Sequence, residues 1–398
     1  MPEWLSFLLF FLLTSTFWTG VNLYVVNRFL HLLGVVQRRR RWQAAFLAVA
    51  FLYPIGALTE RYLLPGGPGG WLMIAGSYHI GGVVLCLCTF FLGDVGLLVA
   101  RLFRWLRTEK RQPAGMRIRA LLAPPPRPQL LVEVAVAALA VAAALWGGHR
   151  DPRVVRVEVT AAPGSGLDQA VRIAAFSDVH LGRLVGTREL ERIVEMTNAL
   201  KPDIVLIPGD LFDDASACAA DAVPALAGLD APLGIFMTRG NHEFYVGDKH
   251  WRPWIAATPV RILSQEAVQV RPDLAIAGAD DRHYRSDTGL TDKESVDRAV
   301  AAAGTRGFLV LATHRPDPAD EAVALGADLV VTGHTHAGQI PPFQIFAPMS
   351  NQHFLHGLYQ LGAGTLYVSS GAGTWGPRMR LLAPSEIVEI VVQPGASE

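Results

Sequence analysis

The chain has 398 residues, of which 51% are hydrophobic and 18% are charged. A chain this apolar is not intrinsically disordered, it is longer than one small core requires, and its three cysteines are too few for a disulfide framework. The zero net charge hides a separation, because residues 1–150 carry 15 basic and 5 acidic side chains whereas residues 151–398 carry 20 and 30. The sequence therefore predicts two chemically different halves, 1–150 and 151–398.

The first half is predicted to be a membrane anchor. It contains four apolar stretches, each near the roughly 17–25 residues that cross a bilayer as a helix. Tryptophans mark their ends, as expected at a membrane interface. A signal peptide is not favoured for the first stretch, because no basic segment precedes it and no small-residue cleavage site follows. We therefore predict an all-α transmembrane region with four spans, at about residues 4–26, 42–64, 71–92 and 130–146.

Charge predicts the orientation of this anchor. Basic residues gather in the loop that contains Arg38–Arg41 and in the loop between residues 101 and 127. The positive-inside rule places both loops in the cytoplasm, where we expect them to contact lipid head groups rather than nucleic acid. Four spans then place the second half outside the cytoplasm, whereas three spans, without the short alanine-rich fourth stretch, would place it inside. Segment 94–107 has arginine and apolar residues at helical spacing and is predicted to be an amphipathic helix on the cytoplasmic face.

The first half also leaves room for a different function, that of a membrane transporter or sensor with a regulatory metal-binding domain. The polar candidates for a transport path are His79, Asp94 and Glu133. We favour interfacial or hydrogen-bonded roles for them, because Asp94 and Glu133 lie near predicted cytoplasmic ends of the spans and His79 has no obvious partner.

The second half alternates apolar strands with amphipathic helices. Such alternation predicts an α/β sheet covered by helices on both faces. The expected strands are at residues 154–160, 171–176, 204–207, 234–238, 274–278, 308–312, 328–331, 365–369 and 387–392, and the expected helices at 188–200, 221–229, 293–303 and 318–325.

Metal-ligand residue types follow five of these strands. In α/β sheets, ligands bind outside the carboxyl ends of the strands. Each motif is weak by itself, but five in succession are a strong signal. The candidate ligands are Asp178, His180, Asp210, Asn241, His314, His334 and His336, with His242 beside Asn241.

Seven oxygen and nitrogen ligands without a thiolate suit Mn, Fe, Zn or Co. Two such ions can hold the attacking and leaving oxygens of a phosphoryl centre, and each lowers the pKa of a bound water. The sequence has neither a Walker-type phosphate loop nor a serine-nucleophile elbow, which disfavours a nucleotide motor and a serine hydrolase.

These motifs resemble those of the calcineurin-like metallophosphoesterases. The resemblance covers about residues 170–392. Two further motifs resemble a membrane-associated bacterial branch that includes UDP-2,3-diacylglucosamine hydrolases and other phospholipid-directed phosphoesterases. The family motifs are Asp178-Val-His180, Gly209-Asp210-Leu-Phe-Asp213, Gly240-Asn241-His242-Glu243, Thr313-His314 and Gly333-His334-Thr-His336, and the branch motifs are Ala337-Gly338-Gln339 and Pro377-Arg378-Met-Arg380.

The resemblance implies a four-layer α/β/β/α sandwich and a role for each residue. His242 would act as general acid or stabilise phosphate charge. Ala337 stands where relatives often carry glycine, which should not disturb ligation. One metal would be held by Asp178, His180, Asp210 and His336, and a second by Asp210, Asn241, His314 and His334, with Asp210 bridging the two.

Several neighbouring residues have two interpretations each. Asp213 is either an acceptor that orients a ligand histidine or a helix cap. Arg183, Arg239, Arg378 and Arg380 could pair with a phosphate or form surface salt bridges.

Together these features predict a multi-pass membrane protein with a dinuclear, metal-dependent phosphoesterase domain outside the cytoplasm. Metal-activated hydroxide would hydrolyse a phosphoester or pyrophosphate, and the anchor favours a lipid-linked substrate because enzyme and substrate then share one membrane. Hydrolysis of a nucleotide or nucleic-acid phosphodiester is the alternative within the enzyme class. The acidic second half argues against nucleic acid, which needs a basic groove.

Overall fold

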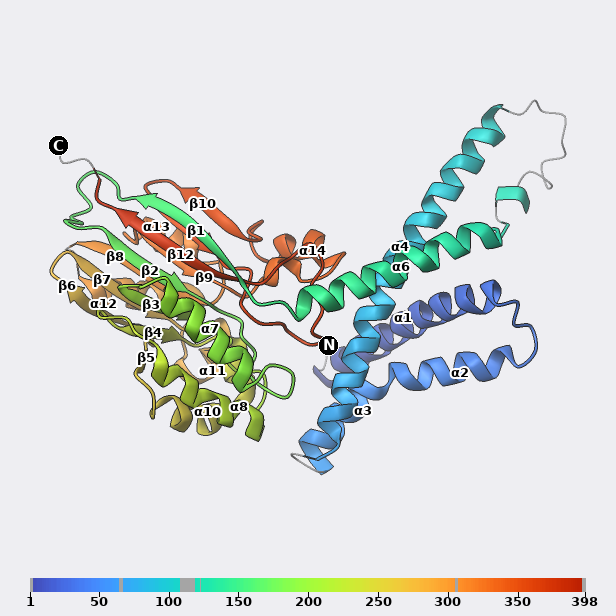
Figure 1. Cartoon of the computed structure of the whole chain (residues 1–398), viewed down its shortest axis with the longest axis horizontal. Coiled ribbons are helices and arrows are strands. Elements are labelled where there is room, and N and C mark those ends of the chain that lie inside the picture. The colour runs from blue at the N-terminus through green and yellow to red at the C-terminus, as the bar shows by residue number, and fades with distance from the viewer. Residues whose placement is uncertain (1–2, 64–66, 108–118, 122, 305–306, 396–398) are drawn as a thin grey trace. The chain divides into compact units, whose positions relative to one another are not determined.

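The computed structural model describes residues 3–63, 67–107, 119–121, 123–304 and 307–395 (Figure 1). The chain divides into two compact units, Met1–Ala144 and Leu145–Glu398, called here the first and the second unit.

The first unit is helical throughout its described elements. Three helices in the described part of the chain are long and apolar enough to cross a membrane, namely Arg39–Leu58, Gly69–Arg107 and Arg127–Gly148. They contain most of the second, third and fourth predicted spans. The first predicted span coincides with a further helix, but most of its side chains up to residue 11 lie outside the described part. The elements are α1 (Glu3–Leu32), α2 (Arg39–Ala50), α3 (Leu52–Leu58), the π-helix η1 (Thr59–Leu63), α4 (Gly69–Arg107) and α6 (Arg127–Gly148).

Segment 94–107 is not a separate amphipathic helix, and this expectation was wrong. It continues the third span, so that α4 has 39 residues. At 1.5 Å per residue such a helix is about 58 Å long, which is well beyond the roughly 30 Å of a hydrocarbon core. The helix continues through Asp94, whose carboxylate is bound by side chains of the neighbouring helix α1. It pairs with Arg28 and accepts a hydrogen bond of 2.6 Å from the Tyr24 hydroxyl.

The other two polar candidates for a transport path also have partners. Glu133 accepts a hydrogen bond of 2.7 Å from Gln129 Nε2, and His79 Nε2 lies 2.8 Å from Asn22 Oδ1. All three polar residues are therefore engaged within the helical unit, in keeping with hydrogen-bonded roles.

The second unit contains two mixed six-stranded sheets. The first has the order β1-β12-β2-β3-β4-β5, with β2, β3, β4 and β5 parallel, and the second has the order β10-β11-β9-β8-β7-β6, with β11, β9, β8 and β7 parallel. The strands are β1 (Arg153–Thr160), β2 (Val171–Ala175), β3 (Ile204–Pro208), β4 (Ile235–Thr238), β5 (Val260–Ile262), β6 (Glu266–Arg271), β7 (Leu274–Ala279), β8 (Phe308–Thr313), β9 (Leu329–Thr332), β10 (Gly357–Leu361), β11 (Gly364–Val368) and β12 (Glu386–Gln393).

Helices and 3-10 turns connect these strands. The longest, α7 and α12, carry apolar residues at helical spacing, which is how a helix covers one face of a sheet. The elements are α7 (Thr187–Ala199), α8 (Ala217–Ala222), η2 (Val223–Gly228), α9 (Asn241–Val246), α10 (Asp248–Ile255), η3 (Arg282–Tyr284), α11 (Arg285–Thr288), α12 (Asp292–Ala303), α13 (Ala319–Ala324), η4 (His336–Gly338) and α14 (Phe343–Ser350).

The core of the second unit lies on both faces of each sheet. Between the sheets, Ile204 and Phe236 of the first belong to one buried cluster with Ile276 and Val310 of the second. On the outer faces, α7 packs against the first sheet and α12 against the second. Burial on both faces explains why the central strands are continuous apolar runs. It also leaves the strand ends as the place for polar side chains.

Candidate metal centre

The predicted ligands meet where strands from both sheets end. Asp178 and His180 follow β2, Asp210 follows β3 and Asn241 follows β4, all in the first sheet. His314 follows β8, and His334 and His336 follow β9, in the second sheet. Six of the seven side chains are buried, and His334 is half-buried.

Backbone conformation marks the same positions. Five of these residues have a positive φ, between 49° and 71°, a region that side chains other than glycine rarely adopt. Such strain persists only where the surrounding structure holds it, and it concentrates at functional sites. The five are Asp178, His180, Asp210, His334 and His336.

One group of possible ligand atoms is formed by Asp178, His180 and His336. The Nε2 atoms of the two histidines are 3.0 Å apart, and His336 Nε2 lies 3.5 Å from Asp178 Oδ1. Asp210 Oδ2 lies 3.9 Å from His180 Nε2. Four donors thus face one small volume.

A second group is formed by Asp210, His314 and His334. His314 Nε2 lies 3.2 Å from Asp210 Oδ2, 3.2 Å from His334 Nδ1 and 3.1 Å from Asn241 Oδ1. Asp210 therefore borders both groups, as a bridging ligand must.

These separations fit a metal ion. With bonds of about 2.1 Å to nitrogen or oxygen, neighbouring ligand atoms are about 3.0 Å apart in an octahedron and about 3.4 Å apart in a tetrahedron. The described separations run from 3.0 to 3.9 Å, and all except the 3.9 Å between Asp210 and His180 fall close to this range. The donor set therefore fits divalent ions in both groups.

Electrostatics prepares only part of the set for cations. Burial lowers the pKa of His314, but the charge of Asp210 outweighs burial and raises this pKa to about 10, whereas two other ligands are shifted toward their metal-binding forms. Burial, together with the charges of His314 and Arg315, lowers the pKa of His334 well below its usual value. Burial also raises the pKa of Asp210, but the neighbouring histidines outweigh it and hold that pKa well below its usual range. A neutral imidazole and an ionised carboxylate are the forms that bind metals.

Asp213 joins the first group to His242. Its Oδ1 atom lies 3.2 Å from His180 Nδ1 and 3.1 Å from His242 Nδ1. The N-cap of the following helix α8 is Ser216, so Asp213 orients histidines rather than capping that helix. Burial lowers the pKa of His242, but the charges of Asp210 and Asp213 exceed this effect and raise it to about 9. This shift favours the protonated form of His242, which can donate a proton.

Glu243 supports the site, although no role was predicted for it. Its fully buried carboxylate accepts hydrogen bonds of 2.8–3.1 Å from the backbone N–H groups of Asp210, Leu211, Phe212 and Gly240. It therefore fixes the loop that carries Asp210 and the start of α9.

Arg315 was also missed by the sequence reasoning. Its Nε donates to Asp281 Oδ2 at 2.6 Å, Nη1 lies 2.6 Å from His334 Nε2, and Nη2 donates to Asn241 Oδ1 at 3.2 Å. A positive charge thus stands beside the second ligand group. Its place directly after His314, at a strand end, was the signal available.

Three of the four arginines with open interpretations are engaged with groups of the protein, and two of them are buried rather than in surface salt bridges. Arg239 is buried, forms ion pairs with Asp280 and with Asp248 and lies over the Tyr284 ring at 3.8 Å. Arg380 is buried and donates to backbone carbonyl groups, among them those of Gly373 and Ala383. Arg378 pairs with Glu189 at 2.8 Å.

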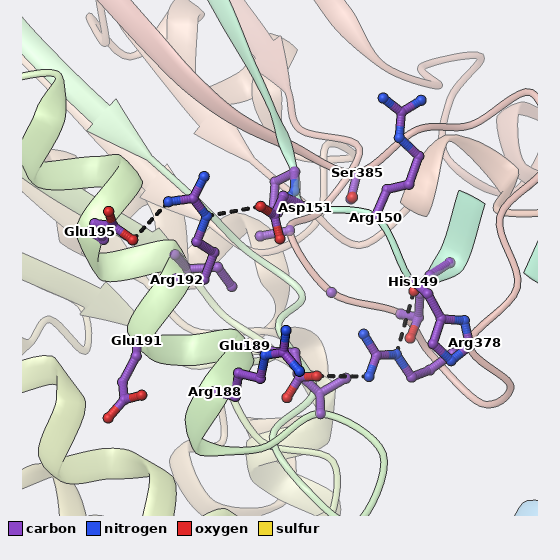
Figure 2. A pocket seen from close by; sticks show the side chains of 17 residues that line it. His149, Arg150, Asp151, Arg188, Glu189, Glu191, Arg192, Glu195, Arg378 and Ser385 are labelled. Atoms are coloured by element: carbon purple, nitrogen blue, oxygen red, sulfur yellow. Dashed lines mark hydrogen bonds and ion pairs between the residues drawn. The ribbon is translucent and has the colours of Figure 1, made fainter. Parts of the chain in front are cut away.

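A separate cavity of about 550 Å³ lies at the beginning of the second unit (Figure 2). It is lined by Gly148–Pro152, by the first turns of α7 and by Ala372–Thr374. Arg192 pairs there with Asp151 at 2.8 Å and with Glu195 at 2.7 Å. None of the seven predicted metal ligands lines it.

Comparison with known proteins identifies the family. The sequence pattern of the calcineurin-like phosphoesterases matches residues 171–338. A transmembrane protein with metallophosphoesterase domain from Danio rerio is 31% identical over 367 residues, which are 89% of this chain and 81% of that protein. An uncharacterized metallophosphoesterase from Campylobacter jejuni is 34% identical, covering 56% of this chain and 59% of that protein. Among solved structures, the NAD nucleotidase of Haemophilus influenzae matches 51% of this chain and 45% of its own, at 13% identity and a TM-score of 0.35.

Mixed α/β sheets with metal-ligand residue types at the strand ends define a candidate metal-binding protein, and the relatives specify its class. The chain belongs to the calcineurin-like metallophosphoesterase family and is a hydrolase of phosphoesters. Its relatives include animal as well as bacterial proteins, so the resemblance is not confined to a bacterial branch.

Proposed function

We propose that this protein is a multi-pass membrane phosphoesterase that uses two divalent metal ions to hydrolyse a lipid-linked phosphoester or pyrophosphate. The observation that carries the proposal is that Asp210 belongs to one ligand group and borders the other, on a chain whose described residues include three helices able to cross a membrane. The α/β/β/α sandwich inferred from the sequence would hold these groups between its sheets.

The proposed ligand sets are those implied by the family resemblance. Asp178, His180, Asp210 and His336 would hold one ion, and Asp210, Asn241, His314 and His334 the other. Manganese is our first choice among Mn, Fe, Zn and Co. When bound, the ions would supply a hydroxide at neutral pH and stabilise charge on the phosphoryl oxygens.

Two residues of the chain would act directly on the substrate. His242, kept protonated by Asp210 and Asp213, would give its proton to the leaving oxygen. Arg315 would bind a phosphoryl oxygen, since its guanidinium lies beside Asn241 and His334 and is held in place by Asp281.

A lipid-linked substrate is supported by the anchor rather than by the metal groups. Enzyme and lipid would be confined to one membrane, and the resemblance to UDP-2,3-diacylglucosamine hydrolases suggests a phospholipid or a lipid pyrophosphate.

With four spans the second unit would lie outside the cytoplasm. A reporter enzyme fused after Glu398 tests this orientation: activity confined to the cytoplasm would refute it.

The test of activity uses the full-length protein in detergent with Mn²⁺ and a chromogenic phosphodiester. Wild type should hydrolyse the diester, whereas Asn241→Ala and His334→Ala should lose nearly all activity. Glu191→Gln, an exposed change on α7, serves as the matched control. Absence of hydrolysis in wild type, or equal rates in the ligand variants, would refute the proposal.

The same assay separates the substrate classes. Faster turnover of a lipid pyrophosphate in mixed micelles than of free nucleotides would support the lipid-linked substrate, and the reverse order would support the nucleotide alternative. A transporter is not favoured, because His79, Asp94 and Glu133 are all engaged with neighbouring side chains.

A further inference from the structure

Helix α14 exposes large apolar side chains on the second unit. None of its eight residues is buried, and Ile345 and Met349 are 68% and 72% exposed. Phe343 and Phe346 are exposed as well. Soluble surfaces carry single exposed apolar residues, but a cluster of this size marks a place where something apolar binds.

The cluster continues across the neighbouring segment. Trp375 and Leu382 are also exposed, and hydrogen bonds join their segment to α14 and to Gln339, which precedes that helix. Gln344 Nε2 donates to the carbonyl of Leu381 at 2.9 Å, and Trp375 N–H donates to Gln339 Oε1 at 3.0 Å. The six exposed apolar residues, called here the α14 surface, are Phe343, Ile345, Phe346, Met349, Trp375 and Leu382.

The end of α6 packs against this same segment. The last turn of α6, from Leu145 to Gly148, belongs to the second unit. A Cβ atom added to Gly147 would lie 2.3 Å from the carbonyl oxygen of Arg380, and one added to Gly148 would lie 2.3 Å from that of Arg378. Both arginines stand between Trp375 and Leu382 in the chain. The α14 surface is thus linked through one short segment to the end of a helix that can cross a membrane.

Residues at the end of α6 have the character of a membrane interface. Trp146 is 65% exposed, and the Arg150 guanidinium lies over its ring at 4.4 Å. Tryptophan and arginine are the side chains that gather where hydrocarbon meets head groups. Arg150 and Arg378 also line the charged cavity of Figure 2, so polar groups adjoin the apolar ones.

We propose that the α14 surface lies in the interfacial layer of the bilayer that α6 crosses, with its apolar side chains among the lipids. The inference rests on the proposed membrane anchoring, but it requires neither hydrolysis nor a lipid substrate. A bilayer is the occupant that the structure favours, because the surface begins where the apolar helix ends. Trp375, whose ring centroid is 6.5 Å from that of His242, extends this surface to the metal centre.

Site-directed fluorescence quenching tests this placement. The full-length chain, with Cys86, Cys88 and Cys218 replaced by alanine, carries a polarity-sensitive fluorophore on Met349→Cys and is reconstituted into phosphatidylcholine–phosphatidylglycerol vesicles. Leu325→Cys is the matched control: this exposed apolar residue precedes β9, at the end opposite to His334. Val136→Cys, within α6, reports whether that helix is in the membrane.

Nitroxide-bearing lipids should cause a loss of fluorescence at positions 136 and 349 and none at 325. Quenching at 136 without quenching at 349 would overturn the inference and leave the anchor intact. No quenching at either position would overturn both the inference and the proposed membrane anchoring. A label at 349 that is shielded from aqueous iodide but not quenched by the lipids would show that protein covers the surface, for example a second copy of this chain, and would also overturn the inference.

Discussion

Replacing Glu243 with glutamine tests how the Asp210 loop is held. In the wild type, Oε1 accepts from Leu211 and Phe212, and Oε2 accepts from Asp210 and Gly240. Glutamine has nearly the same shape but one accepting oxygen and one NH2 group. Two of the four backbone N–H groups would therefore face another donor.

The expected cost follows from these two lost hydrogen bonds. A buried donor left unsatisfied costs about 1–3 kcal/mol, so Glu243→Gln should destabilise the second unit by about 2–6 kcal/mol. For a unit of this size, each kcal/mol lowers the melting temperature by roughly 2–4 °C, which predicts a decrease of roughly 4–24 °C. Metal affinity and activity should fall as well, because the loop carries Asp210.

The measurement is thermal unfolding of the full-length protein in detergent, followed by circular dichroism, together with activity in Mn²⁺. Glu191→Gln removes the same charge from an exposed site on α7 and should melt like wild type. If Glu243→Gln melts no lower than Glu191→Gln and keeps full activity, the carboxylate does not hold the loop and the reasoning is wrong.

Three further substitutions separate the remaining roles. Asp213→Asn removes a charge that raises the pKa of His242, so His242 should lose its proton at lower pH and the alkaline limb of the pH–rate profile should move to lower pH. An unmoved limb would contradict the effect of Asp213 on His242. Arg239→Ala leaves Asp280 buried without its partner, which costs about 3–5 kcal/mol, so the melting temperature should fall while KM stays constant. A raised KM with an unchanged melting temperature would indicate phosphate binding instead. Arg315→Gln removes a charge-assisted contact of about 1.5–3 kcal/mol, so kcat/KM should fall roughly 10- to 150-fold, and an unchanged value would exclude a role in phosphate binding.

Most of the strands that could be predicted are apolar on both faces. All nine predicted strands coincide with strands of the structure. Burial between two layers leaves a continuous apolar run in most of them, whereas β1, a largely exposed edge strand, was predicted from its alternation of polar and apolar residues. The missed strands β5, β6 and β10 lie at sheet edges or are short, and β6 and β10 have no fully buried residue. Partial exposure leaves them with a mixed composition that no periodicity distinguishes from a loop.

The site was predictable to the extent that its residues follow such strands. Asp210 and His314 stand directly after apolar runs, so position and residue type together indicated them. Glu243 and Arg315 act through contacts with residues far away in the chain, about 33 residues in the case of Glu243 and Asp210, which no local pattern records. Hydropathy also failed to predict that the third span continues past Asp94 as one helix. The groups that bind this carboxylate, on Tyr24 and Arg28, lie on another helix and are far away in the sequence.

The glycines of the motifs show that the ligand positions interlock. A Cβ atom on Gly240 would lie 2.2 Å from Asp210 Oδ1, and one on Gly333 would lie 2.3 Å from Asp178 Oδ2. Gly209 has a φ of +78°, and its Cβ would lie 2.8 Å from His314 Nδ1. Gly333 and His314 follow strands of the second sheet, whereas Asp178 and Gly209 follow strands of the first. The ligand Asp178 thus fills the space beside Gly333, and the ligand His314 fills the space beside Gly209. The two sheets must therefore pack before either ligand group is complete, which couples metal binding to folding of the whole second unit.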